Sequence, residues 1–192
     1  QAQVHGPGVD VLAARAGGNA VAADHLLLQL VSFSAFFLDG FAYVAEAQVG
    51  RAVGARDRAG FRRAVRLTSE LALATALLLA VSVWLGGDAV IKALTSLGEV
   101  ATLAGVYLPW AGLYVLLSVA AFQLDGVFIG ATGTRQMRNA GLISLAMFLA
   151  CALPMAATWG NHGLWAAFVL FVVARALALL PYYRRLERGL AA

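Results

Sequence analysis

Charged side chains are scarce in this sequence. Of its 192 residues only 12% are Asp, Glu, Lys or Arg, whereas 61% are apolar. About a quarter of the residues of an ordinary soluble domain are charged, and they supply the polar shell around its core. The composition therefore excludes an ordinary soluble globular domain.

Cysteine and the common catalytic motifs are also lacking. The one cysteine, Cys151, excludes a disulfide framework and a redox pair, and its apolar surroundings favour a small core residue. No spacing of His, Cys, Asp or Glu is typical of a zinc site, and no Gly-x-x-x-x-Gly-Lys-Ser/Thr loop is present to hold a nucleotide. The sequence predicts no enzyme chemistry, no metal and no organic cofactor.

The excess of positive charge is small, with 14 basic residues against 10 acidic ones. A basic protein raises the question of a nucleic-acid partner. Here the basic residues lie in short segments between apolar runs, as they do in the loops of membrane proteins. We therefore expect a lipid bilayer and no nucleic acid as the partner.

Long apolar runs are what the sequence has in abundance. Residues 100–124 carry no charged side chain, and residues 139–174 carry none apart from His162. Because about 20 apolar residues cross a bilayer as a helix, the predicted fold is an all-α polytopic helical membrane protein. We expect a transmembrane domain over residues 19–192 and a poorly structured or residual segment over residues 1–18. Its five spans are predicted at about residues 20–50, 64–87, 100–124, 139–159 and 163–183.

The distribution of basic residues predicts the orientation of these spans. Eleven of them fall after the first span, after the third span or in the C-terminal tail, whereas Lys92 and Arg15 fall on the opposite side. Basic loops stay in the cytoplasm. We expect an inner or plasma membrane location with Arg58 and the C-terminus in the cytoplasm, and with Lys92 and His162 outside.

Four polar residues follow one another at intervals of seven in the first span: His25, Ser32, Asp39 and Glu46. Seven residues rotate a helix by only about 20° beyond two full turns, so the four share one stripe. An ionisable group at membrane depth costs about 2.5 kcal/mol or more unless it faces a cavity or a partner. Asp39 is therefore a candidate cation or proton site, and the alternative is a polar seam between helices.

Asp125 is the second candidate for the cation site. It ends the third span in a Phe-x-Leu-Asp-Gly motif at residues 122–126, which repeats the motif at residues 36–40. The alternative is a charge that rests at the membrane surface. Candidates for the wall of a substrate cavity are His25, Ser32, Glu46, Phe36 and Gln123.

Two further charges in the spans are interpreted as structural. Glu70 follows Arg66 by four residues, the spacing of an ion pair on a helix surface. Arg175 precedes Arg184 by nine residues, about 13 Å along a helix, so it lies too deep to reach the membrane surface easily. We expect Arg175 to pair with an inward-facing carboxylate, and a substrate contact is the alternative.

An ordered set of short motifs resembles one known family. The motifs Ala-Ala-Asp-His at 22–25, Phe-Phe-Leu-Asp-Gly-Phe-Ala at 36–42 and Glu-Ala-Gln-Val-Gly at 46–50 resemble the eighth helix of MATE (multidrug and toxic compound extrusion) transporters. The stretches at residues 107–110, 122–131, 137–139 and 160–165 resemble their tenth to twelfth helices, most closely in the DinF-type branch. The resemblance covers roughly residues 11–188.

The resemblance implies a secondary active transporter that exchanges cationic or amphipathic drugs for H⁺ or Na⁺. It also implies that this sequence is most of a C-terminal lobe, with the N-terminal lobe missing. Asp125 matches the acidic cation-binding position of the tenth helix in the NorM-type branch, whereas the matching seventh-helix glutamate has no counterpart here. The alternatives are a non-transporting degenerate fragment or assembly half, and a related flippase of lipid-linked precursors.

Overall fold

The computed structural model describes residues 7–190, with side chains from residue 17 onward. It contains five α-helices: α1 (Pro7–Gly54), α2 (Arg58–Leu94), α3 (Gly98–Gly130), α4 (Thr134–Trp159) and α5 (Asn161–Gly189). Each of the five is long and apolar enough to cross a membrane. The predicted all-α membrane fold with five spans is confirmed, and no strand occurs in the described part of the chain.

The first helix begins earlier than the sequence suggested. Residues 7–18 were expected to lie in a poorly structured segment, but α1 is continuous from Pro7 to Gly54. Proline fits a first helical position because its missing N–H needs no partner there. Gly17 and Gly18 face open space and leave the helix unbroken. The remainder of that expected segment, residues 1–6, lies outside the described residues.

Short connections join the helices into an up-and-down arrangement. Asp57 caps α2, since its Oδ1 accepts a hydrogen bond of 2.9 Å from the backbone N–H of Gly60. The turn between α4 and α5 is Gly160, whose φ of 58° lies in the left-handed region that glycine adopts freely. This turn separates α4 from α5 in the gap between the fourth and fifth predicted spans.

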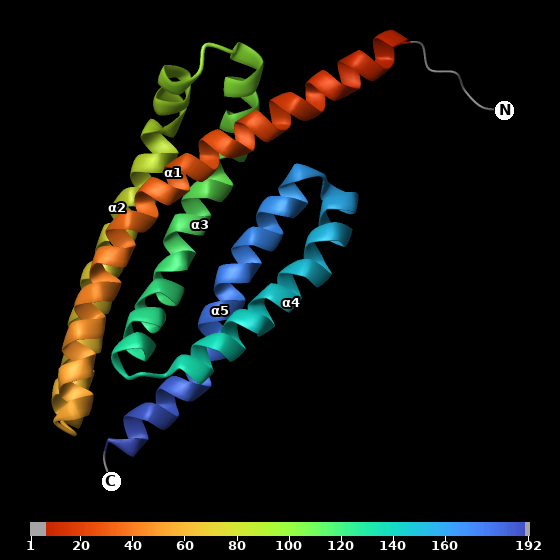
Figure 1. The fold of residues 1–192 in the computed structure, drawn as a ribbon. Coiled ribbons are helices and arrows are strands. Elements are labelled where there is room, and N and C mark those ends of the chain that lie inside the picture. Colours follow the sequence, from red (N-terminus) through yellow and green to blue (C-terminus); the bar gives the residue numbers. More distant parts are fainter. Residues whose placement is uncertain (1–6, 191–192) are drawn as a thin grey trace.

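The connections alternate between the two ends of the bundle (Figure 1). The α1–α2 and α3–α4 connections lie at the same end as the C-terminus, whereas the α2–α3 and α4–α5 connections lie at the opposite end. We call these the arginine end and the tryptophan end. The arginine end carries Arg51, Arg56, Arg58, Arg62, Arg63, Arg66, Arg135, Arg138, Arg184, Arg185 and Arg188. The tryptophan end carries Trp84, Trp110, Trp159 and Trp165.

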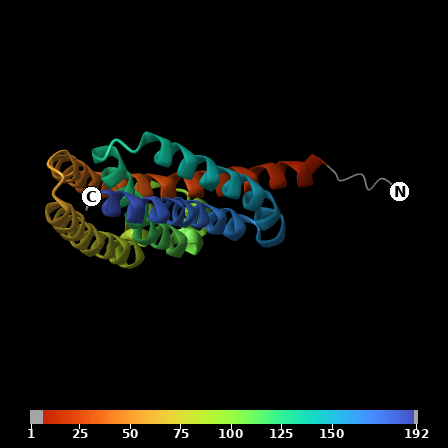
Figure 2. The ribbon, with the colours of Figure 1, turned by 90° about the horizontal axis from the view of Figure 1, so that it is seen from below.

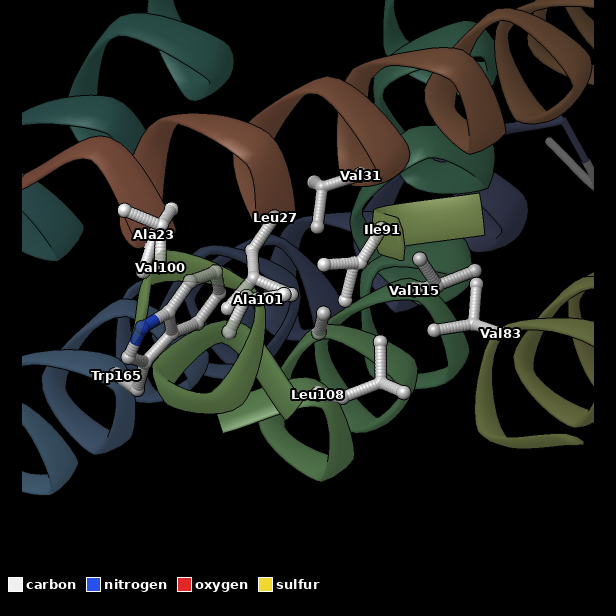
Figure 3. Close-up of a cluster of buried hydrophobic side chains, with 12 residues drawn as sticks. Ala23, Leu27, Val31, Val83, Ile91, Val100, Ala101, Leu108, Val115 and Trp165 are labelled. Carbon is white, nitrogen blue, oxygen red and sulfur yellow. The ribbon is translucent and has the colours of Figure 1, made fainter. Parts of the chain in front are cut away.

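Helix α3 is the centre of the bundle, because it contacts each of the other four helices. Viewed from below, α2 and α4 lie at opposite edges (Figure 2). The largest apolar cluster draws side chains from α1, α2, α3 and α5, including Leu27, Ile91, Leu108 and Trp165 (Figure 3). It fills the half of the bundle nearer the tryptophan end. By contrast, the apolar stretch of α4 is only 17% buried, against 50% for α3.

Candidate functional site

Helices α1 and α3 approach most closely in the half nearer the arginine end, and glycine makes that approach possible. A Cβ atom on Gly126 would overlap the backbone oxygen of Ala42, and one on Gly130 would overlap the backbone oxygen of Glu46. Gly50 faces Gly130 from the other helix. Small residues let membrane helices pack backbone against backbone. The crossing therefore fixes the positions of the neighbouring polar side chains.

A cavity of about 180 Å³ lies beside this crossing. Three carboxylates line it, namely Asp39 and Glu46 from α1 and Asp125 from α3. The rest of the wall comes from Ala42, Tyr43, Phe122, Gly126, Ile129 and Met137. The two aspartates of the repeated Phe-x-Leu-Asp-Gly motif thus face the same cavity, although 86 residues separate them in the sequence.

Asp125 forms a two-pronged ion pair with Arg175 of α5. The Nε of Arg175 donates to Oδ2 at 2.9 Å, and its Nη2 donates to Oδ1 at 3.1 Å. Both side chains are about three-quarters buried, with exposed fractions of 23% for Arg175 and 24% for Asp125. A paired guanidinium and carboxylate satisfy each other's charge and geometry at such depth. Gly141 of α4 lies next to the guanidinium, where a side chain would crowd it.

The other two carboxylates of the cavity have no such partner. Among the described residues, neither Asp39 nor Glu46 forms an ion pair or a side-chain hydrogen bond, and both are partly buried. Arg175 therefore compensates one of three negative charges. A cavity with uncompensated carboxylates at membrane depth attracts a cation or a proton.

The remaining substrate-cavity candidates do not join this cavity. His25, Ser32 and Phe36 are exposed on α1, and His25 contacts Gln29 through a hydrogen bond of 3.2 Å. Gln123 is buried, with an exposed fraction of 5%, and neither polar atom of its amide has a hydrogen-bond partner among the described residues. The stripe on α1 therefore divides, because Asp39 and Glu46 line the cavity whereas its first half is exposed.

Glu70 lies on the surface of α2. Its carboxylate is 3.7 Å from Nε of Arg66, and both side chains are largely exposed. This is the helix-surface geometry that the spacing of four residues predicts. The pair lies outside the cavity.

Asp24 is a partly buried polar contact that the sequence reasoning did not single out. Its Oδ1 accepts hydrogen bonds from Nδ2 of Asn161 at 2.8 Å and from Nε1 of Trp165 at 2.9 Å. These bonds tie α1 to the start of α5 at the tryptophan end. The motif at residues 22–25 contains Asp24, but no periodicity marks it, because both donors lie on a helix more than 130 residues later.

Nearby, an apolar hollow of about 200 Å³ separates α1 from the α4–α5 hairpin. Its walls are Asp24, Leu28, Phe148, Leu164, Trp165 and Phe168. The one carboxylate here is already satisfied by two neutral donors. This hollow therefore differs from the carboxylate cavity at the other end of α1, which keeps free negative charge.

Comparison with known proteins gives one consistent result. A family model described as MatE matches residues 9–158. The chain is 39% identical over 178 residues to DNA damage-inducible protein F of Escherichia coli (strain K12), an alignment that covers 92% of this chain and 38% of that protein. It is 31% identical over 189 residues to the probable multidrug resistance protein NorM of Xanthomonas campestris pv. campestris, covering 91% and 39%.

The fold is also similar to a solved structure. The crystal structure of the eukaryotic MATE transporter AtDTX14 superposes with a TM-score of 0.75 at 18% identity, over 90% of this chain and 40% of that one. The chain thus spans about two fifths of the length of the relatives that it matches.

Proposed function

Because the chain belongs to the MatE family, we propose that it is the C-terminal lobe of a secondary active transporter that exports cationic or amphipathic small molecules in exchange for H⁺ or Na⁺. Family membership and five apolar helices make it a multi-pass membrane protein. The exchange mechanism, the substrate class and the second lobe belong to the proposal.

The observation that carries the proposal is the cavity between α1 and α3. It places Asp39, Glu46 and Asp125 around about 180 Å³, with Arg175 as the one cationic partner. Apolar packing alone does not require three carboxylates at one point in a membrane protein, since each one is costly there. A coupling ion that enters the cavity supplies the missing positive charge.

The three carboxylates differ in whether they have an ion-pair partner. Arg175 already holds Asp125 through two hydrogen bonds, so Asp39 and Glu46 carry the charge that is free to bind H⁺ or Na⁺. A coupling ion transmits energy only if it binds one conformation of the transporter better than the other. Glycine contacts hold α1 against α3, so the remaining helix in the wall is α4, which contributes Met137. Movement of α4 against the other two helices changes the cation affinity of the cavity.

Exposed apolar faces support an association with a second lobe. On α1, Phe33, Phe36 and Tyr43 are exposed, and on α4, Leu149 and Leu153 are exposed. Large apolar patches mark surfaces that contact lipid or another protein segment. We propose that lipid covers part of these faces and the N-terminal lobe covers the rest.

We propose that the arginine end faces the cytoplasm, in line with the retention of basic loops on that side. Single cysteines at positions 58 and 162, introduced in a Cys151→Ala background, test this orientation in intact cells. An impermeant maleimide is expected to label position 162 and to spare position 58 until the membrane is opened. Labelling of position 58 from outside would reverse the orientation.

Drug efflux from proteoliposomes tests the coupling role in the complete transporter. Under an imposed proton or sodium gradient, Asp39→Asn is expected to abolish gradient-driven efflux while the protein still reaches the membrane. Asp125→Asn is expected to lose gradient-driven efflux and to retain substrate binding. Ser32→Ala, an exposed change one heptad before Asp39, is the matched control and should transport normally. Efflux at the wild-type rate from both aspartate variants would refute a coupling site here.

A further inference from the structure

The first turns of α2 present an array of arginines that the proposed transport function does not use. Arg58, Arg62, Arg63 and Arg66 line a surface hollow of about 660 Å³ together with Ala59. Spacings of three, four and eight residues keep these side chains on one side of the helix. The hollow lies at the arginine end, on a helix at the edge of the bundle (Figure 2).

The hollow has more positive than negative charge. Glu187 of α5 forms ion pairs with both Arg58, at 3.4 Å, and Arg62. Arg66 lies 3.7 Å from Glu70, and Arg63 has no ion-pair partner among the described residues. In addition, Nε of Arg58 is buried without a hydrogen-bond partner. Four guanidinium groups thus share two carboxylates, so the hollow is suited to an anion.

An apolar stripe continues from the hollow along the same helix. Starting at Arg63, steps of four, four, three and four residues lead to Leu67, Leu71, Ala74 and Leu78, all of which are exposed. From Leu67 to Leu78 the stripe rises about 16 Å, close to half of the roughly 30 Å hydrocarbon core of a bilayer. A cationic hollow at the end of a stripe one leaflet long matches the two parts of a phospholipid.

We propose that the hollow binds the phosphate of an anionic phospholipid and that the acyl chains lie on the leucine stripe. Arginine matches phosphate because its planar guanidinium donates two parallel hydrogen bonds to the oxygens. An anionic headgroup adds negative charge to a hollow with a surplus of arginine. A zwitterionic headgroup adds an ammonium group that the same arginines repel.

Lipid retention by the purified complete protein, measured by native mass spectrometry, tests the proposal with phosphatidylglycerol and phosphatidylcholine as the probes. Arg63→Gln combined with Arg66→Gln is expected to lower the preference for phosphatidylglycerol by roughly tenfold to thirtyfold, because each arginine that donates a hydrogen bond to the phosphate contributes about fivefold. The matched control is Arg135→Gln combined with Arg138→Gln. It removes the same charge from the same end but outside the hollow, and it should keep the preference.

A lysine variant and a competition with free phosphate complete the test. Arg63→Lys combined with Arg66→Lys keeps both charges and is expected to retain most of the preference. Free inorganic phosphate is expected to leave the bound lipid in place, since it lacks the acyl chains that the stripe contacts. Equal losses in the Arg63/Arg66 and Arg135/Arg138 glutamine variants would overturn the proposal, because the preference would then follow net charge alone. Displacement of the lipid by free phosphate would also overturn it.

Discussion

The two ends of helix α1 bury their carboxylates in different ways. Near the tryptophan end, Asp24 accepts hydrogen bonds from two neutral donors, Asn161 and Trp165. Near the arginine end, Asp39 and Glu46 share a cavity with Asp125. Asp125 is already paired with Arg175. A carboxylate held by fixed neutral donors serves to join helices. A group of carboxylates with too few partners keeps negative charge without a fixed donor, as the proposed cation site requires.

The packing around the two sites also differs in the size of the side chains that fill it. A broad apolar cluster from four helices fills the half nearer the tryptophan end. Nearer the arginine end, α1 and α3 meet backbone to backbone at Gly126 and Gly130. Close glycine contacts fix the two helices without bulky side chains, which leaves space for the cavity beside them. Substitutions in each half, and one on the surface of α2, are expected to lower stability by different amounts.

The largest loss of stability is expected from Gly126→Ala. The added methyl group would overlap the backbone of Ala42, which has no side-chain freedom with which to move aside. Overpacking of a tight interface costs about 1–3 kcal/mol and more where backbone must shift, so we expect a loss of at least about 3 kcal/mol in unfolding free energy. Thermal unfolding in detergent measures it. The matched control is Gly40→Ala, a helical glycine with open space around it; an equal loss there would disprove the close contact.

Removal of Arg175 is expected to have the next largest effect. Arg175→Met leaves Asp125 charged and unpaired at three-quarters burial. Breaking a fully buried ion pair costs about 3–5 kcal/mol, and partial exposure lowers the expected loss to about 2 kcal/mol. Combining Arg175→Met with Asp125→Asn should restore most of the stability. A double variant no more stable than Arg175→Met would show that the two groups do not compensate each other.

Trp165→Phe is expected to have a moderate effect at the opposite end. It removes one of the two donors to Asp24 while Asn161 stays in place, and the smaller phenyl ring leaves a small cavity in the apolar cluster. A hydrogen bond contributes about 0.5–1.5 kcal/mol net, and the cavity adds a similar amount, so the expected loss is about 1.5 kcal/mol. Gradient-driven efflux per folded protein should be unchanged. The control is Trp159→Phe at an exposed tryptophan, and reduced efflux by folded Trp165→Phe would link Asp24 to coupling.

The smallest effect is expected from Glu70→Gln. Glu70 and Arg66 are both exposed, and exposed pairs at this spacing contribute about 0.3–0.5 kcal/mol. The free energy of unfolding, measured by chemical denaturation, should therefore fall by no more than this amount. A loss above about 1 kcal/mol would show that Glu70 contacts more than Arg66.

The sequence predicted the number, type and order of the helices because apolar runs and charged connections alternate so clearly. The pattern of basic residues also predicted that eleven arginines lie on one side, and in the structure they lie at one end of the bundle. The start of α1 was less accessible, since the glycines at residues 17 and 18 are typical of a break but lie in a continuous helix. Each glycine costs a helix about 1 kcal/mol, which the favourable residues on both sides can offset.

The site was only partly accessible to sequence reasoning. The spacing of seven residues placed Asp39 and Glu46 on one stripe, but it could not show that α3 covers only the second half of that stripe. As a result His25, Ser32 and Phe36 were grouped with a cavity that they do not line. The glycines at 126 and 130 give the missing information, because they mark where α3 meets α1. The motif is too common to be assigned to one helix pair from sequence alone.

Cation binding by the purified complete protein tests whether Asp39 and Glu46 bind the coupling ion. Proton release in weakly buffered solution and retention of radioactive sodium together report whichever coupling ion is used. Wild-type protein and Asp24→Asn are both expected to bind the cation, whereas Asp39→Asn combined with Glu46→Gln is not. Cation binding by that double variant with wild-type affinity would show that the charge that attracts the ion lies elsewhere.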